Sequence, residues 1–306
     1  MTLPFVSVII PCYNAEEDIE ACLQGVLGQK YPTFEVIVVD DASTDKTLEL
    51  LRVHQTIKLV RNSENLGPGG TRNRGIMKSK GELLVSLDSD SVVEDPEWLA
   101  KHATVQASLD RTIVGGRIRG IGRGLVAHAD SYCHWLTNIP DSHPAVITAS
   151  SPYRFGIVSR HLVTNNMSLR RSTLYLVGLF DERFRTGEDL DFCERALRLG
   201  VTLRFEPSIV VKHRDRERLL DFLWYFYKAG KDRIPIREKN ATPFRWLLPR
   251  GLPSSLLLAL PLTFLLPFQP IIAWWPYDKR VVLYYPWILL ACVAMVLGIM
   301  SYFWKR

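Results

Sequence analysis

The sequence predicts an α/β fold in which helices cover both faces of a mostly parallel sheet, followed by a pair of apolar helices. In the first 90 residues, short continuous apolar runs alternate with segments of helical spacing. This pattern is typical of parallel strands that are buried on both faces. Farther along, residues 251–275 and 281–304 contain no Asp, Glu, Lys, Arg or His. The 306 residues suffice for one domain of roughly 200–250 residues and an appendage.

Apolar periodicity assigns the elements in chain order. In the first half, strands are predicted at residues 6–10, 34–39, 57–60 and 82–88. Helices are predicted at 15–27, after a cap near Ser43 and Thr44, and after the glycine-rich loop 67–70 to about Ser79. In the second half, we expect a strand at 163–170, a helix at 188–199 ending at Gly200, and a strand at 202–211. Residues 120–160 show no firm period and are predicted as a loop region that orders on ligand binding.

Polar side chains follow three of the predicted strands, at the point where each strand ends. They are found in residues 11–14, at Asp40 and Asp41, and at Asp88 and Asp90. In open parallel sheets, ligands bind beyond the carboxyl ends of the strands. The sequence therefore predicts a single site at this edge of the sheet.

Asp88 and Asp90 are the most informative pair, because they end an apolar run with one residue between them. In an extended chain, residues i and i+2 point the same way. An unpaired buried carboxylate is costly, whereas Mg²⁺ is typically held by one or two carboxylates together with phosphate oxygens. The pair predicts a divalent cation carrying a diphosphate, with a solvated turn as the alternative.

Asp40, Asp41 and Arg72 each have a structural and a chemical interpretation. The two aspartates precede Ala42-Ser-Thr-Asp45, which is typical of a helix N-cap. Asp40 lies too early for that role, and its carboxylate could instead accept from a base N–H or a ribose hydroxyl. Arg72 follows a glycine-rich loop that lacks the P-loop spacing. It belongs either to an ordinary helix start or to a phosphate-binding loop.

Five residues of the second half are further candidates. Glu188 and Asp189 open a helix, where acids are favoured by the macrodipole and where an ionised carboxylate could also serve as a general base. Asn165 and Asn166 are either strand-edge amides or ligands for sugar hydroxyls. His213 follows an apolar strand and is either a third metal ligand or a histidine beside the membrane.

Charge is concentrated next to the apolar segments. Residues 212–250 hold eleven Lys and Arg against five Asp and Glu, a net charge of +6 out of +6 for the whole chain. Residues 1–211 are mildly acidic, which argues against nucleic-acid binding. Lys305 and Arg306 follow the second apolar segment, so the positive-inside rule places both flanks on the cytoplasmic side. The five cysteines show no CxxC spacing and are expected to be buried thiols.

The apolar segments are each long enough to cross a membrane. We expect a two-helix hairpin; four prolines make a re-entrant first segment an alternative, and a buried soluble core is a second alternative. Residues 218–227 are aromatic with basic neighbours, and predict a helix that lies in the bilayer interface or packs on the domain. The N-terminal apolar run lacks a basic start and is predicted as a strand, without a signal peptide. The predicted organisation is a catalytic domain at 1–213, a basic segment at 214–250 and a membrane hairpin at 251–306.

Five motifs in this order resemble the inverting family 2 glycosyltransferases, which have the GT-A fold. The motifs span about two-thirds of the chain, and the ordered set is far more specific than any one of them. They are Val8-Ile-Ile-Pro-Cys-Tyr-Asn14, Val39-Asp-Asp-Ala-Ser-Thr-Asp45, Asn65-Leu-Gly with Arg72-Asn-Arg-Gly75, Asp88-Ser-Asp90, and Gly187-Glu-Asp-Leu-Asp191.

The resemblance implies a role for each matched residue. It implies nucleotide contacts from Pro11, Tyr13, Asp40, Asp41 and Arg72, with Asp88 near the ribose. It implies a divalent metal, Mg²⁺ or Mn²⁺, at Asp90, with Asp88 and His213 as further ligands. Asp189 corresponds to the catalytic base, with Glu188 beside it, and Asn165 and Asn166 are expected near the sugar or the acceptor.

The implied reaction is transfer of one sugar from a nucleotide sugar, expected to be a UDP-sugar, to a hydroxyl of a lipid-linked or glycan acceptor. The cell membrane is the expected location, with the catalytic domain on the cytoplasmic face. Processive relatives carry Gln-x-x-Arg-Trp, whereas this chain has Thr242-Pro-Phe-Arg-Trp246, so a non-processive enzyme is expected.

Three alternatives stay open at this point. A polyprenyl-phosphate glycosyltransferase is nearest in mechanism, although the Glu-Asp pair favours a hydroxyl acceptor. A nucleotidyltransferase and a non-catalytic membrane scaffold belong to other classes.

Overall fold

The computed structural model describes residues 3–134, 144–151, 161–240, 249 and 251–304, and within them a single mixed sheet carries the fold. Its first half is parallel, in the order β3-β2-β1-β4. These strands are β1 (Val6–Cys12), β2 (Phe34–Asp40), β3 (Lys58–Arg61) and β4 (Leu83–Leu87). All four were predicted, and their order confirms the parallel sheet in this half.

The second half of the sheet mixes strand directions. Strand β8 (Asn166–Arg170) runs antiparallel to both β4 and β6 (Thr112–Ile121), and β6 is parallel to β9 (Thr202–Arg214). The short strands β5 (Ser91–Val92) and β7 (Ala145–Ile147) pair antiparallel with β9. The α/β class is thus confirmed, while β5, β6 and β7 were not predicted.

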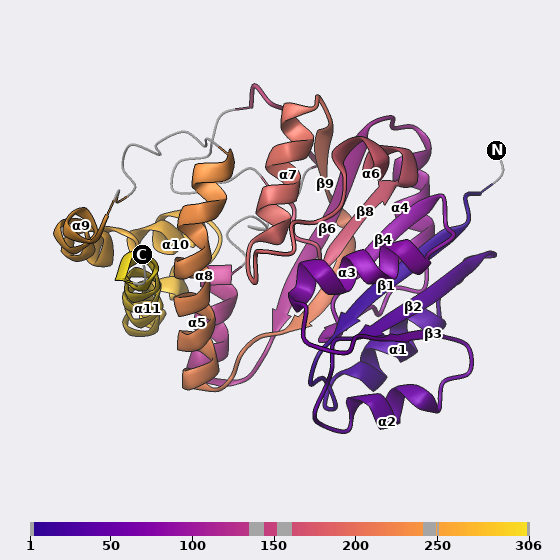
Figure 1. Cartoon of the computed structure of the whole chain (residues 1–306), viewed down its shortest axis with the longest axis horizontal. Helices are drawn as coiled ribbons and strands as arrows, with labels where there is room; N and C mark the ends of the chain where they lie inside the picture. Colours follow the sequence, from indigo (N-terminus) through magenta and orange to yellow (C-terminus); the bar gives the residue numbers. More distant parts are fainter. Residues whose placement is uncertain (1–2, 135–143, 152–160, 241–248, 250, 305–306) are drawn as a thin grey trace.

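Two layers of helices cover the sheet (Figure 1). On one face, α1 (Ile19–Leu27), α2 (Thr47–Arg52) and α4 (Trp98–Ala107) pack on alternate residues of β1 such as Val8 and Ile10. On the other face, α3 (Gly67–Lys78), α6 (Arg171–Val177) and α7 (Glu188–Arg198) pack around Ile9 and Leu84. Because successive side chains of a buried strand point to opposite faces of the sheet, β1 contributes to two separate cores.

Two local predictions were wrong. Helix α3 begins at Gly67 instead of after the glycine loop, because the Asp41 carboxylate accepts from the backbone N–H groups of Leu66 and Gly67 and satisfies the helix start. Residues 120–160 are not one loop region, since they include the end of β6, helix α5 (Gly124–His134) and β7. Residues 135–143 and 152–160 of that range lie outside the described part.

The C-terminal helices form one end of the molecule, beyond α5 (Figure 1). Helix α8 (Leu219–Asn240) is followed by α9 (Leu252–Leu265), α10 (Phe268–Trp274), the short helix η3 (Lys279–Tyr284) and α11 (Tyr285–Trp304). By length and composition, Pro253–Trp274 and Lys279–Trp304 could each cross a membrane. All five cysteines are free thiols; four are buried as predicted, whereas Cys133 is partly exposed.

Candidate active site

The ends of β1, β2 and β4 meet, as their parallel register requires. The backbone N–H of Asp41 donates to the carbonyl of Cys12 at 2.8 Å. Asn14 accepts from the Thr44 N–H at 2.9 Å, and its own N–H donates to the Ser43 hydroxyl at 3.0 Å. The Asn14 backbone lies in the left-handed region, at φ 49°, which Asn adopts more readily than most residues. These bonds hold the loops after β1 and β2 as one rim.

Asp40 and Asp41 are both buried in this rim but have different partners. Asp41 is bound within the protein, because its two oxygens accept from Asn62, Leu66 and Gly67 at 2.8–2.9 Å. Asp40 accepts from the Ser43 N–H at 3.3 Å, and its other oxygen lies 3.4 Å from Arg61. Asp41 therefore organises the start of α3, while Asp40 keeps an oxygen with only a distant ionic partner.

Pro11 and Tyr13 flank the end of β1. Pro11 is buried within the strand, and Tyr13 follows it with 49% of its surface exposed. The Tyr13 ring is available to stack on a flat ligand at the mouth of the site.

Asp88 and Asp90 do not share an extended strand, so the prediction that they point the same way from i and i+2 positions was wrong. The Ser91 N–H donates to the Asp88 carbonyl at 3.2 Å, which closes a turn. The turn separates the carboxylates: Asp88 faces Arg72, and Asp90 faces His213.

Asp90 and His213 have the arrangement of a two-residue cation site. The antiparallel pairing of β5 with β9 places them together, with His213 Nε2 at 3.3 Å from Asp90 Oδ2. Asp90 Oδ1 is buried and accepts no hydrogen bond within the described residues. Among those residues, no group of three or more His, Cys, Asp and Glu side chains could hold a metal. A site with two protein ligands and an open side suits Mg²⁺ or Mn²⁺ that also binds phosphate. The role of Asp88 as a further ligand remains a prediction.

Asp215 lies behind His213, on the opposite side from Asp90. Its Oδ1 is 3.7 Å from His213 Nδ1, and both side chains are buried. Burial lowers the pKa of His213, but the two carboxylates outweigh burial and raise it to about 10. A carboxylate behind a metal-binding histidine fixes its ring orientation. Sequence reasoning missed Asp215, although its i+2 spacing from His213 on a strand was visible.

Arg72 joins two motifs that are far apart in sequence. Its Nη2 donates to Asp88 Oδ1 at 2.5 Å, its Nη1 to Glu188 Oε1 at 2.6 Å, and its Nε to Ser86 at 3.2 Å. Arg72 is 3% exposed, and Glu188 is 5% exposed. Burial raises the pKa of Glu188 to about 7, against the opposing effect of Arg72. The guanidinium therefore brings the Asp88 turn and the start of α7 into one cluster.

Asp189 is partly exposed at the start of α7 and accepts from the Leu190 N–H at 2.7 Å. The preceding Gly187 has φ 72°, a left-handed conformation that glycine adopts without strain. Of the two acids in this motif, Asp189 is thus the one open to solvent, while Glu188 is held by Arg72.

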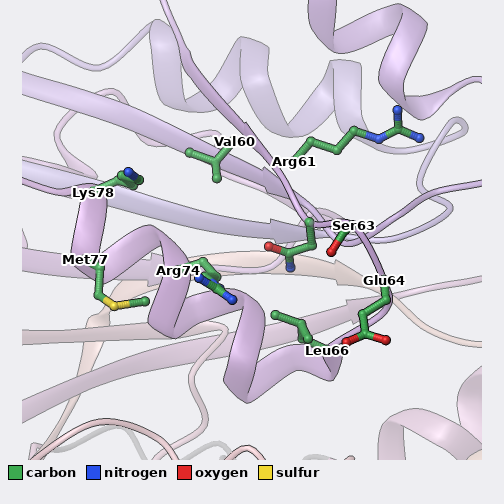
Figure 2. A pocket seen from close by; sticks show the side chains of 9 residues that line it. Val60, Arg61, Ser63, Glu64, Leu66, Arg74, Met77 and Lys78 are labelled. Atoms are coloured by element: carbon green, nitrogen blue, oxygen red, sulfur yellow. The ribbon is translucent and has the colours of Figure 1, made fainter.

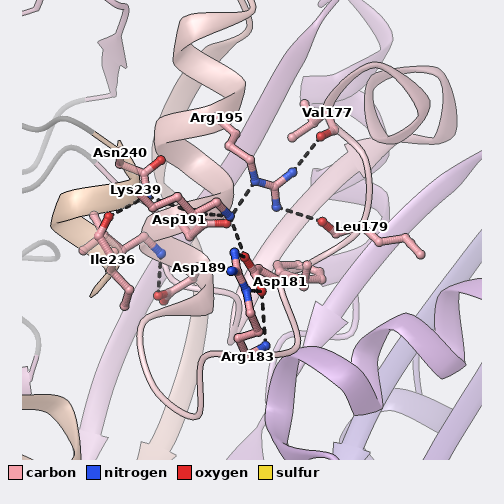
Figure 3. Close-up of polar contacts among 12 residues, drawn as sticks. Val177, Leu179, Asp181, Arg183, Asp189, Asp191, Arg195, Ile236, Lys239 and Asn240 are labelled. Carbon is pink, nitrogen blue, oxygen red and sulfur yellow. Dashed lines mark hydrogen bonds and ion pairs between the residues drawn. The ribbon is translucent and has the colours of Figure 1, made fainter. Parts of the chain in front are cut away.

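Helix α8 fixes the start of α7, which the sequence did not indicate. Asp232 of α8 accepts from the N–H groups of Arg185 and Thr186 and from the Thr186 hydroxyl at 3.0–3.1 Å. One turn into α7, Asp191 pairs with Arg195 and with Lys239 and Asn240 at the end of α8 (Figure 3). The loop and first turns that carry Glu188 and Asp189 are therefore attached to α8.

Asn165 and Asn166 are buried side by side but differ in free capacity. Asn165 Oδ1 accepts from Ser91 at 2.6 Å and from the Asp88 N–H at 3.3 Å, while its Nδ2 has no partner among the described residues. Asn166 accepts from Trp98 and His102 and donates to two backbone carbonyls. Asn165 retains a donor for a ligand, whereas the Asn166 amide is satisfied within the protein.

A separate pocket of about 470 Å³ lies between β3, the loop that follows it and α3 (Figure 2). Its lining includes the basic side chains of Arg61, Arg74 and Lys78. It does not include the carboxylates of the strand-end site.

Known proteins resemble this chain in sequence and in fold. Residues 7–172 match the family model described as Glycosyl transferase family 2. Glycosyltransferase AglE of Haloferax volcanii is 30% identical over 267 residues, which cover 83% of each chain. The succinoglycan biosynthesis protein ExoO of Rhizobium meliloti is 31% identical over 232 residues, which cover 70% of this chain and 62% of that protein.

Among solved structures, the mannosyltransferase PcManGT of Pyrobaculum calidifontis, in complex with GDP-Man and Mn²⁺, aligns with 100% of this chain and 88% of its own. The TM-score is 0.63 at 18% identity, a likeness of fold. The sheet and these likenesses define a glycosyltransferase with a GT-A fold. The chain belongs to glycosyl transferase family 2.

Proposed function

We propose that this glycosyltransferase is membrane-anchored and inverting, and that it moves one sugar from a nucleotide sugar to a hydroxyl of a lipid-linked or other membrane-associated acceptor. A UDP-sugar is the proposed donor, and the reaction is non-processive and metal-dependent. The observation that carries the proposal is the Arg72 bridge, because it brings the donor-side Asp88 and the base-side Glu188 within one guanidinium of each other.

On the donor side, Asp90 and His213 would hold Mg²⁺ or Mn²⁺, and the unpartnered Asp90 Oδ1 supports this assignment. When bound, such a metal would neutralise charge on the leaving nucleoside diphosphate. Tyr13 stacks on the base, and Asp40 accepts from the base or the ribose, with Pro11 and Asp41 shaping that pocket. Asp88 lies near the ribose, and Arg72 orients it.

On the acceptor side, Asp189 takes the proton from the acceptor hydroxyl. Its partial exposure supports this role, since a general base must reach its substrate. The hydroxyl oxygen then attacks the anomeric carbon from the face opposite the leaving group, which inverts the configuration. Asn165 donates its free N–H to the sugar or the acceptor.

The basic segment and the two apolar helices support anchoring at the cytoplasmic face of the cell membrane. Residues 214–250 and Lys305–Arg306 supply positive charge on both flanks of the apolar segments. An acceptor held in the same membrane would meet the site repeatedly, which suits a lipid-linked substrate.

Asp189→Asn tests the assignment of the base. Donor binding, measured by calorimetry with nucleotide sugars and Mn²⁺, should be retained, while transfer falls by roughly 10²–10⁴-fold. The exposed Asp110→Asn is the matched control and should be fully active. Transfer at the wild-type rate by Asp189→Asn would reject the base.

The products separate the alternatives. Release of nucleoside diphosphate with an acid-stable product supports a hydroxyl acceptor. A sugar lost from lipid phosphate under mild acid would favour a polyprenyl-phosphate glycosyltransferase, and pyrophosphate release would favour a nucleotidyltransferase. Absence of any metal-dependent turnover across a panel of nucleotide sugars would favour a non-catalytic scaffold.

A further inference from the structure

The turn between the two apolar segments packs against the catalytic domain. The Tyr132 hydroxyl of α5 donates to Asp278 at 2.7 Å, and the Trp274 indole N–H donates to the Tyr132 carbonyl at 3.0 Å. The Tyr132 ring also packs against Trp274, with centroids 5.3 Å apart. Behind these contacts, Tyr132 forms a small buried cluster with Val281 and Ile288. The start of the second apolar helix therefore lies on α5.

The rest of that helix packs along α8. Ala291 and Ala294 share a buried cluster with Phe222 and Phe226 of α8 and Ala129 of α5. Farther along, two glycines allow the two backbones to touch. Gly298 lies against the backbone of α8 at Tyr227 and Lys231, and Gly230 against Met295. Near the end of the pair, the Tyr302 hydroxyl lies 3.5 Å from Glu238.

These contacts argue against a hairpin that crosses a bilayer away from the domain. The segment Lys279–Trp304 has 26 residues, or about 39 Å at 1.5 Å per residue. Its first turns lie on α5 and its last turns on α8. A spanning arrangement would bring the charged residues of α8, such as Asp232 and Arg233, to the depth of the hydrocarbon, which is costly.

The C-terminal helices α9 and α11 expose apolar side chains that contact no other part of the described structure closely enough to be buried. Along η3 and α11, a stripe of apolar side chains recurs every seven residues at Leu283 of η3 and at Leu290, Leu297 and Trp304 of α11, and they are 42–76% exposed. Next to α11, α9 exposes Leu257, Leu260 and Leu265 among other apolar side chains, at 65–77%. In the segment Pro253–Trp274, which includes α9, only 11% of the most apolar stretch is buried. Both helices lie at the end of the molecule in Figure 1.

We propose that α9 and α11 lie in the plane of the membrane, embedded in one leaflet through this stripe, and do not cross it. The partner is an anionic lipid surface. At the turn, the exposed Lys279 lies over the ring of the half-exposed Trp275, which is the chemistry of an interfacial anchor, while the neighbouring Arg280 pairs with Asp278 at 2.9 Å. The inference deepens the membrane attachment of the proposed function and is independent of its transfer chemistry.

Labelling of single introduced cysteines in sealed, cytoplasmic-face-out vesicles tests the arrangement. Tyr277→Cys reports the turn, and Met77→Cys on α3 reports the catalytic domain; both positions are about half-exposed. Wild-type protein measures the background from native thiols. An impermeant maleimide should label both variants to the same extent before permeabilisation.

The possible results separate this inference from the proposed function. Labelling of Tyr277→Cys only after permeabilisation, with Met77→Cys labelled before it, shows a spanning hairpin and overturns the inference. Labelling of both variants only after permeabilisation supports the in-plane arrangement and overturns the cytoplasmic placement.

Flotation with vesicles of phosphatidylglycerol and phosphatidylethanolamine tests the lipid surface itself. The double variant Leu290→Glu, Leu297→Glu should bind the vesicles with an affinity at least roughly tenfold lower than wild type, because two charges enter the apolar stripe. Val53→Glu, at another exposed apolar position, is the matched control and should float like wild type. Unchanged flotation of the double variant overturns the inference. The inference is also overturned if wild type is a dimer, the double variant is a monomer, and both float equally. A second copy of the chain, and not lipid, would then cover the stripe.

Discussion

Asp88 and Glu188 lie on either side of the Arg72 guanidinium, which donates to one at 2.5 Å and to the other at 2.6 Å. Each acid is close in sequence to a residue with a proposed chemical role: Asp90 lies two residues after Asp88, and Asp189 directly follows Glu188. The distance between the proposed donor-binding and acceptor-binding residues therefore depends on the buried Arg72 side chain.

Replacing Arg72 should disrupt both sides of the site. Arg72→Ala leaves two acids without their partner, and we expect a loss of roughly 3–5 kcal/mol of stability, as for other broken buried pairs. Arg72→Lys keeps the charge but cannot bridge two carboxylates with a planar fork. We expect it to fold and to lose most transfer activity. Thermal unfolding and turnover are the measurements.

Arg74→Ala is the control for Arg72, because it lies on the same helix with an exposed side chain. It should leave stability and turnover near wild type. Full activity of Arg72→Lys would contradict the positioning role.

Asp215→Asn should weaken metal binding without removing a proposed ligand. Asp215 lies behind His213, at 3.7 Å from Nδ1, and loss of such a partner typically costs 10–100-fold in metal affinity. Mn²⁺ binding followed by electron paramagnetic resonance measures the effect directly. Asp110→Asn should bind Mn²⁺ like wild type, and equal affinity in Asp215→Asn would show that His213 needs no such support.

Asp232→Ala should impair turnover more than donor binding. The change removes three hydrogen bonds to Arg185 and Thr186, each worth about 0.5–1.5 kcal/mol, and loosens the loop that leads to Asp189. We expect a lower kcat with little change in donor affinity. Asp221→Ala, at an exposed position of the same helix, is the control. A change confined to donor affinity would place the defect elsewhere.

Glu188 should make stability depend on pH. Burial raises its pKa from 4.5 to about 7 in the folded protein, so between these values the folded state holds a proton that the unfolded state has released. The contribution of Glu188 to the free energy of unfolding is therefore largest below about pH 4.5 and falls as pH rises to about 7, by roughly 1.4 kcal/mol per pKa unit.

Glu188→Gln removes this slope. The melting temperature of wild type relative to the variant should fall between about pH 4.5 and about pH 7. The exposed Glu64→Gln should track wild type across that range. Parallel profiles for wild type and Glu188→Gln would show that Glu188 titrates normally.

Much of the fold could be predicted from the sequence because its first half is locally consistent. The apolar runs that become β1, β2 and β4 are continuous, and the parallel register brings Asp40 and Asp88 to one edge without further information. The mixed half was harder to predict. Strand β6 contains Gly115, Gly116 and Gly120 and has a register shift after Gly116, so its periodicity is broken.

The site was predicted as a set of residues but not as a set of partners. Asp88 and Asp90 were both identified, yet their carboxylates diverge because a turn, and not a strand, joins them. The partners of Glu188, His213 and the loop before α7 come from distant elements, and a single sequence carries no signal that pairs Arg72 with Glu188 or Asp232 with Thr186.

Helix α8 separates the lipid-facing helices from the start of α7, with Gly230 against α11 and Asp232 against Thr186. In the proposed orientation, the general base therefore stands about one helix diameter, roughly 10–12 Å, above the embedded helices. This height would limit which acceptors reach the site. In this proposed arrangement, an acceptor whose reactive hydroxyl lies close to the lipid headgroups would reach Asp189, whereas we expect a long glycan to project past it.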